Sequence, residues 1–239
     1  MEVDIFIPCF INQLYPETGF NMVKVLEKLG CKINYPQNQT CCGQPSYNGG
    51  YKDEAMKLAN KFLNDFDSNR YIVSPSASCV GMVRHNYEEF FTNSSKINKY
   101  RNLQSRLFEF TEFLLKVLKV EDVGASFNKK ITYHDSCSAI RGLGIKSGPR
   151  KLLSNVTDLQ LIEMNESDTC CGFGGTFSIK MEPISSAMAE QKVANALETG
   201  AEYIVGTDTS CLMHIDGYAK KNNKNIKVMH IADVLAQGL

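Results

Sequence analysis

Eight of the nine cysteines of this chain fall into two copies of one pattern. Each copy has a single Cys, an adjacent Cys-Cys-Gly and another single Cys; the two sets are Cys9, Cys41, Cys42 and Cys79, and Cys137, Cys170, Cys171 and Cys211. The offsets between equivalent cysteines are 128, 129, 129 and 132 residues. Spacings that agree this closely indicate an internal duplication whose halves keep thiols at the same places.

Thiols in this pattern are suited to metal or redox chemistry, because soft thiolates bind zinc and the irons of iron–sulfur clusters. Two adjacent cysteines in a loop point in different directions, which strains a single tetrahedral ion but lets them bind different irons of one cluster. The spacing also differs from the roughly two to four residues that separate cysteines in many structural zinc sites. The pattern therefore favours an iron–sulfur cluster. Zinc is the alternative, and ordinary buried thiols are a weaker one.

The hydrophobic pattern predicts alternating strands and helices that deliver these cysteines. In the first half we expect strands at 3–8, 31–35 and 71–74 and helices at 19–29 and 51–66. In the second half we expect strands at 131–134, 159–163 and 203–206 and helices at 149–155 and 185–198. Each motif cysteine then follows the carboxyl end of a strand, where open α/β sheets place ligand sites. The sequence predicts an α/β fold of two similar halves, each with a mostly parallel sheet flanked by helices.

The repeat places the boundary between the halves near residue 122. It gives a first cysteine-rich repeat at 1–122 and a second at 123–239, each large enough for an apolar core of its own. At the junction we expect a helix at 111–120, followed by a linker at 121–130 that contains Gly124 and Ser126.

Charge and hydropathy limit the partners and the compartment. Lys plus Arg and Asp plus Glu each number 26, and no basic cluster stands out, which argues against nucleic acid or an anionic membrane as the main partner. Nowhere do about 18 apolar residues run together, so we expect no transmembrane segment. The chain is expected to be cytoplasmic, and it could reach a membrane surface through partners. Because cytoplasmic thiols are kept reduced, nine cysteines indicate metal or redox chemistry rather than disulfides.

Other residues near the motifs have less specific roles. Glycine permits tight loops with positive φ, so backbone N–H groups could approach cluster sulfurs at Gly43, Gly172 and Gly174. Three histidines lie three or six residues from a motif cysteine and could carry protons or donate hydrogen bonds, although capping or surface roles suit them as well: His85, His134 and His214. Cys31 has no counterpart in the second half and is expected in the core.

The motifs resemble the cysteine-rich CCG domain, which is duplicated in the B-type chain of heterodisulfide reductase, in glycolate oxidase iron–sulfur subunits and in the C-type chain of the anaerobic glycerol-3-phosphate dehydrogenase. The resemblance is closer to the lactate utilization protein A family and spans essentially the whole chain. The segments that carry it are Phe6-Ile7-Pro8-Cys9, Thr40-Cys41-Cys42-Gly43-Gln44-Pro45, Met82-Val83-Arg84-His85, His134-Asp135-Ser136-Cys137, Thr169-Cys170-Cys171-Gly172-Phe173-Gly174-Gly175-Thr176-Phe177 and Ser210-Cys211-Leu212-Met213-His214.

This resemblance implies an iron–sulfur electron-transfer subunit of a multi-subunit enzyme that oxidises L-lactate to pyruvate. The implied partners are a ferredoxin-like iron–sulfur subunit of the lactate utilization B type and a lactate utilization C-type protein. The eight motif cysteines are the implied ligands of one or two clusters per chain. Four thiolates per half suffice for a [4Fe–4S] cluster. The isolated chain is expected to be inactive toward lactate, because it shows no convincing flavin or nicotinamide site.

The sequence departs from the heterodisulfide reductase pattern in one place. That relative closes each motif with Cys-x-x-Cys, whereas Ser76 and Asp208 stand three residues before Cys79 and Cys211 here. The missing fifth thiolate favours electron transfer over disulfide reduction at a cluster. A heterodisulfide or thiol reductase subunit and a zinc-stabilised assembly module are the alternative functions.

Overall fold

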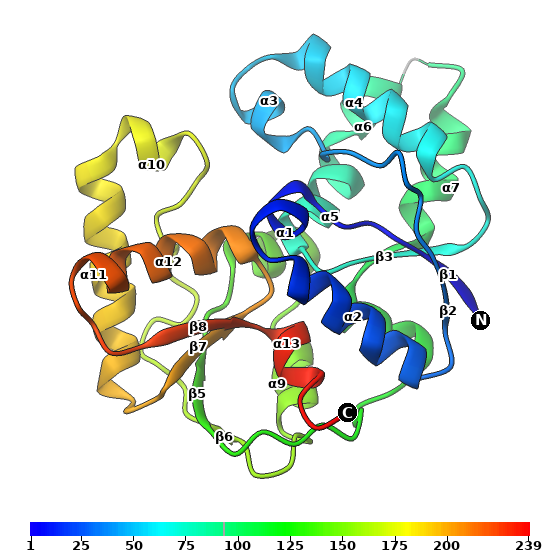
Figure 1. Ribbon diagram of the computed structural model, residues 1–239. Helices are drawn as coiled ribbons and strands as arrows, with labels where there is room; N and C mark the ends of the chain where they lie inside the picture. Colours follow the sequence, from blue (N-terminus) through cyan, green and yellow to red (C-terminus); the bar gives the residue numbers. More distant parts are fainter. Residues whose placement is uncertain (93) are drawn as a thin grey trace.

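The computed structural model describes residues 1–92 and 94–239 and has one four-stranded sheet in each half (Figure 1). The strand orders are β2-β1-β3-β4 and β6-β5-β7-β8, and every pairing within them is parallel. The expected α/β fold of two similar halves is confirmed. The strands are β1 (Glu2–Ile5), β2 (Lys32–Asn34), β3 (Tyr71–Ser74), β4 (Leu107–Glu109), β5 (Lys130–Tyr133), β6 (Gln160–Leu161), β7 (Tyr203–Gly206) and β8 (Lys227–His230).

The register of the strands repeats along with their order. Val3 pairs with Tyr71 in the first sheet, and Ile131 pairs with Tyr203 in the second. These partners are offset by 128 and 132 residues, which are the offsets of the single cysteines that follow the same strands. The duplication thus extends to the hydrogen-bonded ladders.

Helices connect the strands and cover the sheets. In the first half they are α1 (Cys9–Leu14), α2 (Pro16–Lys28), α3 (Gln44–Asn48), α4 (Lys52–Asp65), α5 (Ala77–Gly81), α6 (Glu88–Phe91), α7 (Ile97–Arg106) and α8 (Phe110–Phe113), with π-helical turns η1 (Met82–Asn86) and η2 (Leu114–Leu118). In the second half they are α9 (Ser147–Leu153), α10 (Phe177–Lys180), α11 (Glu182–Glu198), α12 (Thr209–Lys221) and α13 (Ile231–Leu235), with the π-helical turn η3 (Ser138–Gly142).

The long helices follow the expected amphipathic pattern. In α4 the buried residues Ala55, Ala59, Phe62 and Leu63 recur at helical spacing, and they form the stripe that packs beneath the helix. Helix α2 begins with Pro16, which lacks the N–H that a first helical turn leaves unpaired.

Two expectations at the junction were wrong in detail. The helix expected at 111–120 is the short α8 followed by the π-helical turn η2, and it stops at Lys119, whose φ of 59° is left-handed. Strands β4 and β8 were not predicted, because each continues directly into a helix within an apolar run that fits a helix equally well. The linker expected at 121–130 is one residue shorter, because Lys130 is the first residue of β5.

The largest apolar core takes side chains from both halves. Val3, Val25 and Phe113 of the first half pack in one cluster with Ile131 and Leu235 of the second. Helices α2 and α13 adjoin there. A shared core fixes the halves relative to each other, and the division into 1–122 and 123–239 stays a prediction.

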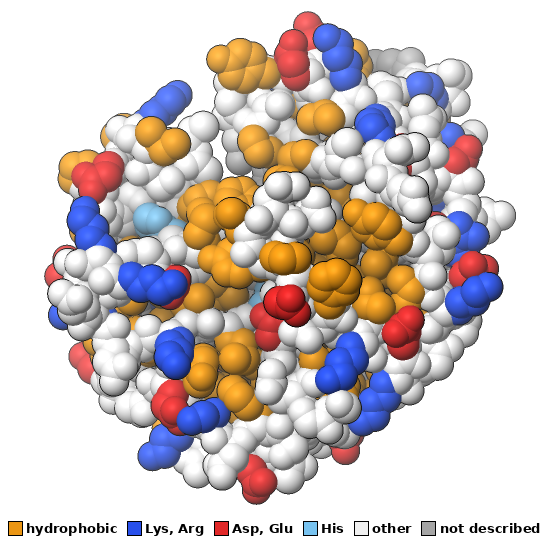
Figure 2. Space-filling view, in the orientation of Figure 1, with side chains coloured by type: hydrophobic (Ala, Val, Ile, Leu, Met, Phe, Trp, Pro, Cys, Tyr) orange, Lys and Arg blue, Asp and Glu red, His pale blue; other side chains and the backbone are white. Residues whose placement is uncertain are grey.

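Each half also has a smaller core of its own beside its cysteines. One contains Cys42 and Cys79, and the other contains Cys171 and Cys211. Figure 2 shows hydrophobic side chains across the middle of one face and a notch above them, between the lobe that carries α10 and the lobe that carries α3. Within the described ranges 1–92 and 94–239, no helix is long and apolar enough to cross a membrane.

Candidate metal centres

The first cysteine group lies at the carboxyl edge of the first sheet. Cys9 begins α1 after β1, Cys41 and Cys42 lie in the loop between β2 and α3, and Cys79 lies in α5 after β3. Because β1 lies between β2 and β3 in a parallel sheet, the segments after all three strands meet at one edge. The four cysteines that were predicted from spacing are brought together there.

Their thiols interact directly. The Sγ atoms of Cys9 and Cys41 are 3.9 Å apart, and the backbone N–H of Gly43 donates to Cys41 Sγ at 3.3 Å. Hydrogen bonding from the Cys42 thiol, and next from the Cys9 thiol, lowers the pKa of Cys41 to about 3. The same contacts with Cys41, together with burial, raise the pKa of Cys9 and of Cys42. One thiolate surrounded by thiols is thus favoured, which is a starting point for metal binding.

The second group repeats this arrangement. Cys137 lies at the start of η3 after β5, Cys170 and Cys171 follow β6, and Cys211 lies in α12 after β7. The N–H of Gly172 donates to Cys170 Sγ at 3.4 Å. Hydrogen bonding from Cys137, and next from Cys171, lowers the pKa of Cys170, while the Cys170 partner raises the pKa of Cys137 and of Cys171. In both halves the first cysteine of the adjacent pair is the preferred thiolate.

The predicted glycines shape the loops that hold the cysteine pairs. Gly43 and Gly172 have φ values of 82° and 92°, which place their N–H groups toward sulfur and disfavour any residue with a Cβ. A Cβ on Gly172 would lie 2.6 Å from the carbonyl oxygen of Ser185, whereas a Cβ on Gly43 would lie 3.4 Å from Leu58. A Cβ on Gly174 would lie 2.9 Å from the side chain of Phe177 at the start of α10. The second loop therefore has less free space than the first.

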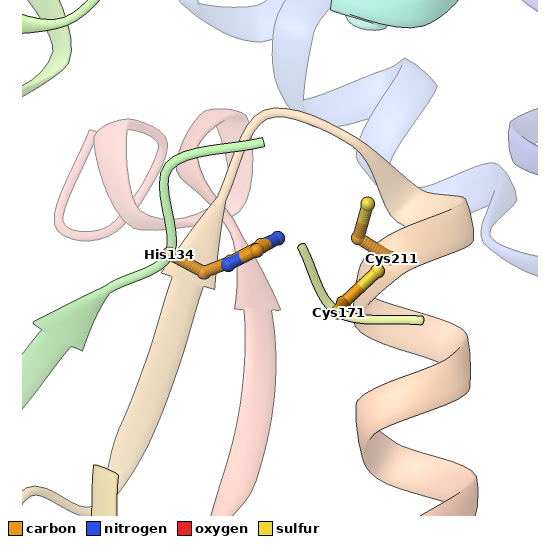
Figure 3. A group of neighbouring side chains, drawn as sticks. All are labelled: His134, Cys171 and Cys211. Carbon is orange, nitrogen blue, oxygen red and sulfur yellow. The ribbon is translucent and has the colours of Figure 1, made fainter. Parts of the chain in front are cut away.

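His134 is the one candidate histidine that reaches a cysteine group. A ring nitrogen of His134 and the sulfurs of Cys171 and Cys211 all lie within 4.8 Å of one another. Figure 3 shows the imidazole pointing from the end of β5 toward the two thiols. The ring is buried, and neither nitrogen has a hydrogen-bond partner among the described residues. Each unsatisfied buried polar group costs about 1–3 kcal/mol.

Burial lowers the pKa of His134 to about 4, and the positive charge of Lys192 contributes to the same shift. The ring is therefore neutral, the form that binds a metal. The backbone of Ser167 and the charge of Asp135 act on this pKa in the opposite direction.

Lys192 is a site residue that the sequence did not reveal. It lies on α11, is 1% exposed, and donates from Nζ to the backbone oxygens of Glu166 and Ser167. Burial lowers its pKa, and the interaction with Cys171 acts in the opposite direction. The available signal was the helical spacing of Lys192 from Ala189 and Ala196, which are buried on the same side of α11.

The two sites differ at two equivalent positions. Three residues before the first single cysteine stand Phe6 in the first half and His134 in the second. Twenty-one residues after the cysteine pair stand Leu63 and Lys192. Phe6 and Leu63 belong to the apolar cluster around Cys42 and Cys79. The first site is lined by aromatic and aliphatic groups, whereas the second has an imidazole and a buried amine.

Residues next to the two groups touch across the halves. Asp208 Oδ1 accepts hydrogen bonds from Ser76 Oγ at 3.1 Å and from the backbone N–H and hydroxyl of Ser78 at 3.0 and 2.8 Å. Its other oxygen accepts from Ser136 Oγ. Ser78 and Ser136 are chain neighbours of Cys79 and Cys137, so one carboxylate joins both sites.

An aromatic contact makes a second connection between the sites. The ring of Phe10, which follows Cys9, meets the ring of Phe173 edge to face at 5.7 Å. Phe173 is two residues after Cys171, so this contact joins α1 of the first half to the cysteine loop of the second.

The remaining candidates make no direct contact with a motif thiol among the described residues, although His214 lies beside the second cysteine loop, next to Phe173 and to Ser185, whose hydroxyl donates to the carbonyl oxygen of Gly172. His85 is exposed on η1, and His214 Nε2 lies 3.0 Å from the hydroxyl of Ser185. Cys31 is buried in the shared core, as expected.

The donor set fits a thiolate-bound metal, but the spacing does not select one. Four thiols, a backbone N–H aimed at sulfur and, in the second site, two unpaired imidazole nitrogens suit iron–sulfur clusters and zinc alike. Two thiolates on one tetrahedral zinc, with Zn–S bonds of about 2.3 Å, are roughly 3.8 Å apart. The Cys9–Cys41 separation of 3.9 Å is close to that value.

Comparison with known proteins agrees with this architecture. The cysteine-rich domain family CCG matches residues 3–84 and 131–216, one match in each half. The fold and the two thiol groups are therefore those of a duplicated CCG protein, as the sequence resemblance indicated.

Individual relatives show to which family of CCG proteins the chain belongs. The chain is 46% identical to lactate utilization protein A 1 of Bacillus mycoides, over 98% of this chain and 96% of the relative. It is 44% identical to lactate utilization protein A of Bacillus subtilis, over 98% and 99%. The chain belongs to the lactate utilization protein A family.

One solved structure shares the fold. A hypothetical protein from Helicobacter pylori aligns with a TM-score of 0.68 at 13% identity, over the whole of this chain and 49% of its own length. The chain thus spans about half the length of that protein, and the likeness concerns the fold.

Proposed function

We propose that the chain is an iron–sulfur electron-transfer subunit of an L-lactate-oxidising system. The observation that carries the proposal is the pair of equivalent four-thiol groups, set at matching sheet edges and joined by direct contacts across the halves. The names of the relatives supply lactate utilization as the process.

Each half would hold its centre through the four cysteines that the sequence predicts: Cys9, Cys41, Cys42 and Cys79, and Cys137, Cys170, Cys171 and Cys211. When bound, an iron–sulfur cluster supplies one-electron transfer. The N–H groups of Gly43 and Gly172 stabilise thiolate charge at Cys41 and Cys170. The buried Cys42, Cys79, Cys171 and Cys211 limit access of water. Four thiolates per half suit a [4Fe–4S] cluster.

The thiol-reductase alternative is less well supported. It needs a fifth thiolate near each centre, and the two positions carry Ser76 and Asp208. These side chains bind each other at 3.1 Å, so they serve the contact between the halves. Neither is free to act on a disulfide.

Zinc is a second candidate because of the 3.9 Å separation between the sulfurs of Cys9 and Cys41. In that case the chain would be a zinc-stabilised assembly module, without redox activity. Metal analysis separates the two functions.

Lactate oxidation would require partners, which we propose to be the ferredoxin-like lactate utilization B-type subunit and the C-type protein, in the cytoplasm. Exposed apolar side chains directly before α4 and in α10, Tyr51 at 67% exposure and Ile179 at 82%, provide surface for docking. The isolated chain would lack turnover, because lactate gives up two electrons and protons and clusters pass single electrons.

The test is anaerobic purification followed by metal and sulfide analysis. Brown protein with iron and acid-labile sulfide in equal amounts supports the proposal, and colourless protein that holds only zinc rejects it. Lactate-dependent reduction of a dye should then appear when the B-type and C-type proteins are added. Turnover by the pure chain would contradict the subunit role. Air must be excluded, because exposed thiolates and clusters oxidise.

A further inference from the structure

We propose that His134 is a direct metal ligand of the second centre, which makes the two centres of the chain chemically unequal. The inference rests on the proposed metal-binding function. A [4Fe–4S] cluster or a tetrahedral zinc takes four ligands from the protein, so His134 would bind in place of one of the four thiolates assigned to the second centre above.

The position of the His134 ring supports a direct role in binding the metal. The ring nitrogen lies within 4.8 Å of the sulfurs of both Cys171 and Cys211, and these sulfurs lie within the same distance of each other. Figure 3 shows the His134 ring pointing from the end of β5 toward the two cysteines, which lie on the loop after β6 and on α12. Three donor atoms from three separate segments thus lie within reach of one metal centre.

The unpaired nitrogens are an independent observation. His134 is 1% exposed, and both ring nitrogens lack a hydrogen-bond partner among residues 1–92 and 94–239. A neutral imidazole can bind a metal through the lone pair of one ring nitrogen. Metal binding would therefore satisfy a group that is otherwise left unpaired.

The first half shows what the position looks like without this role. Phe6 occupies the equivalent place, and its ring packs edge to face against Phe62 at 4.9 Å and against Phe66 at 5.8 Å. In the first half, this position is therefore filled by an apolar aromatic ring that packs against other aromatic rings. Packing of the fold therefore does not require a histidine at this position, and metal binding accounts for the histidine in the second half.

Pulsed EPR on protein labelled with ¹⁵N-histidine tests the assignment, because the chain has only four histidines. Anaerobic protein would be measured in its paramagnetic state, before or after dithionite. We expect a nitrogen coupling of the size found for a directly bound imidazole. It should persist in His85→Asn, whose ring is exposed, and vanish in His134→Phe, which restores the residue of the first site.

The outcomes separate the inference from the function on which it rests. Iron and sulfide with no strong nitrogen coupling in the wild type overturns the His134 assignment and leaves the iron–sulfur proposal standing. Zinc without iron removes the iron–sulfur proposal. X-ray absorption at the zinc edge then decides the assignment, since a nitrogen neighbour lost in His134→Phe supports it and an all-sulfur shell refutes it. The wild-type measurement alone is sufficient if the variant does not fold.

Discussion

Asp208 Oδ1 accepts a hydrogen bond from Ser76 Oγ at 3.1 Å, and this contact crosses from the second half of the chain to the first. The two residues are 132 apart, the same offset that relates Cys79 to Cys211, so equivalent positions of the two repeats bind each other. The positions where a relative has its additional cysteines are used here to hold the two sites together.

Replacing Asp208 by Ala should destabilise the chain by about 3 kcal/mol, because the buried hydroxyls of Ser76 and Ser136 and the N–H of Ser78 would lose their acceptor. Urea unfolding of the metal-free protein measures the change. Asp67→Ala is the control, since that carboxylate is 63% exposed in a surface ion pair and its loss should cost less than about 1 kcal/mol. Equal effects of the two variants would refute a bridging role for Asp208.

The two cysteine loops should respond unequally to the same substitution. Gly43→Ala imposes a positive φ on alanine and should cost about 1–2 kcal/mol. Gly172→Ala imposes the same strain and also sets its Cβ 2.6 Å from Ser185 O, so it should cost roughly 1–3 kcal/mol more. Thermal unfolding and metal content of the two variants provide the comparison. A milder effect at Gly172 would show that the tight contact is relieved by a small shift.

Cys171→Ala should lower the bound iron to about half, if each half holds one [4Fe–4S] cluster. It should also abolish growth on L-lactate in cells that depend on this system. Cys31→Ala is the matched control, because Cys31 is likewise buried but lies in the shared core. It should retain iron and growth, with a modest loss of stability from the small cavity. The same phenotype from both replacements would contradict the ligand assignment.

Stability should fall as the pH rises through the range in which Glu109 ionises. Burial raises the pKa of Glu109 to about 7 in the folded chain, against 4.5 for an exposed glutamate. The folded state therefore prefers the protonated acid. Its contribution is complete below about pH 4.5 and is lost as the pH rises to about 7, a difference on the order of 3 kcal/mol.

Glu109→Gln should remove this part of the pH dependence, as measured by urea unfolding at about pH 5 and about pH 8. Glu202→Gln serves as the control, because that carboxyl is 48% exposed and Lys129 lowers its pKa. If the wild type and Glu109→Gln keep the same slope, Glu109 is not the group responsible.

The sequence predicted the parts of the fold that local patterns determine. Strands β3 and β7 have the expected bounds, because short apolar runs rich in β-branched residues precede turn signals there. Strands β4 and β8, helices α7 and α12 and the π-helical turns were missed. Their identity depends on pairing and packing with distant segments, which periodicity in a short apolar run does not reveal.

The site shows the same limit. Matched spacing was enough to group the cysteines, because parallel strands bring their carboxyl ends to one edge. Lys192 was not predicted, since its burial depends on two carbonyl oxygens from the loop at Glu166 and Ser167. For Asp208, the sequence indicated only that a thiolate is absent from this position. The structure shows that the carboxylate accepts hydrogen bonds from serines beside both cysteine groups.

The core shared by Val3, Val25, Ile131 and Leu235 has a consequence for metal loading. Because it makes the chain one cooperative folding unit, a metal held by either cysteine group stabilises the whole chain against unfolding and not only its own half. Metal bound at one site should therefore raise the melting temperature of the whole chain, including the half that contains the other site. A chain with metal at a single site would unfold in one transition. The half with the empty site would then be stabilised against unfolding by the metal in the other half.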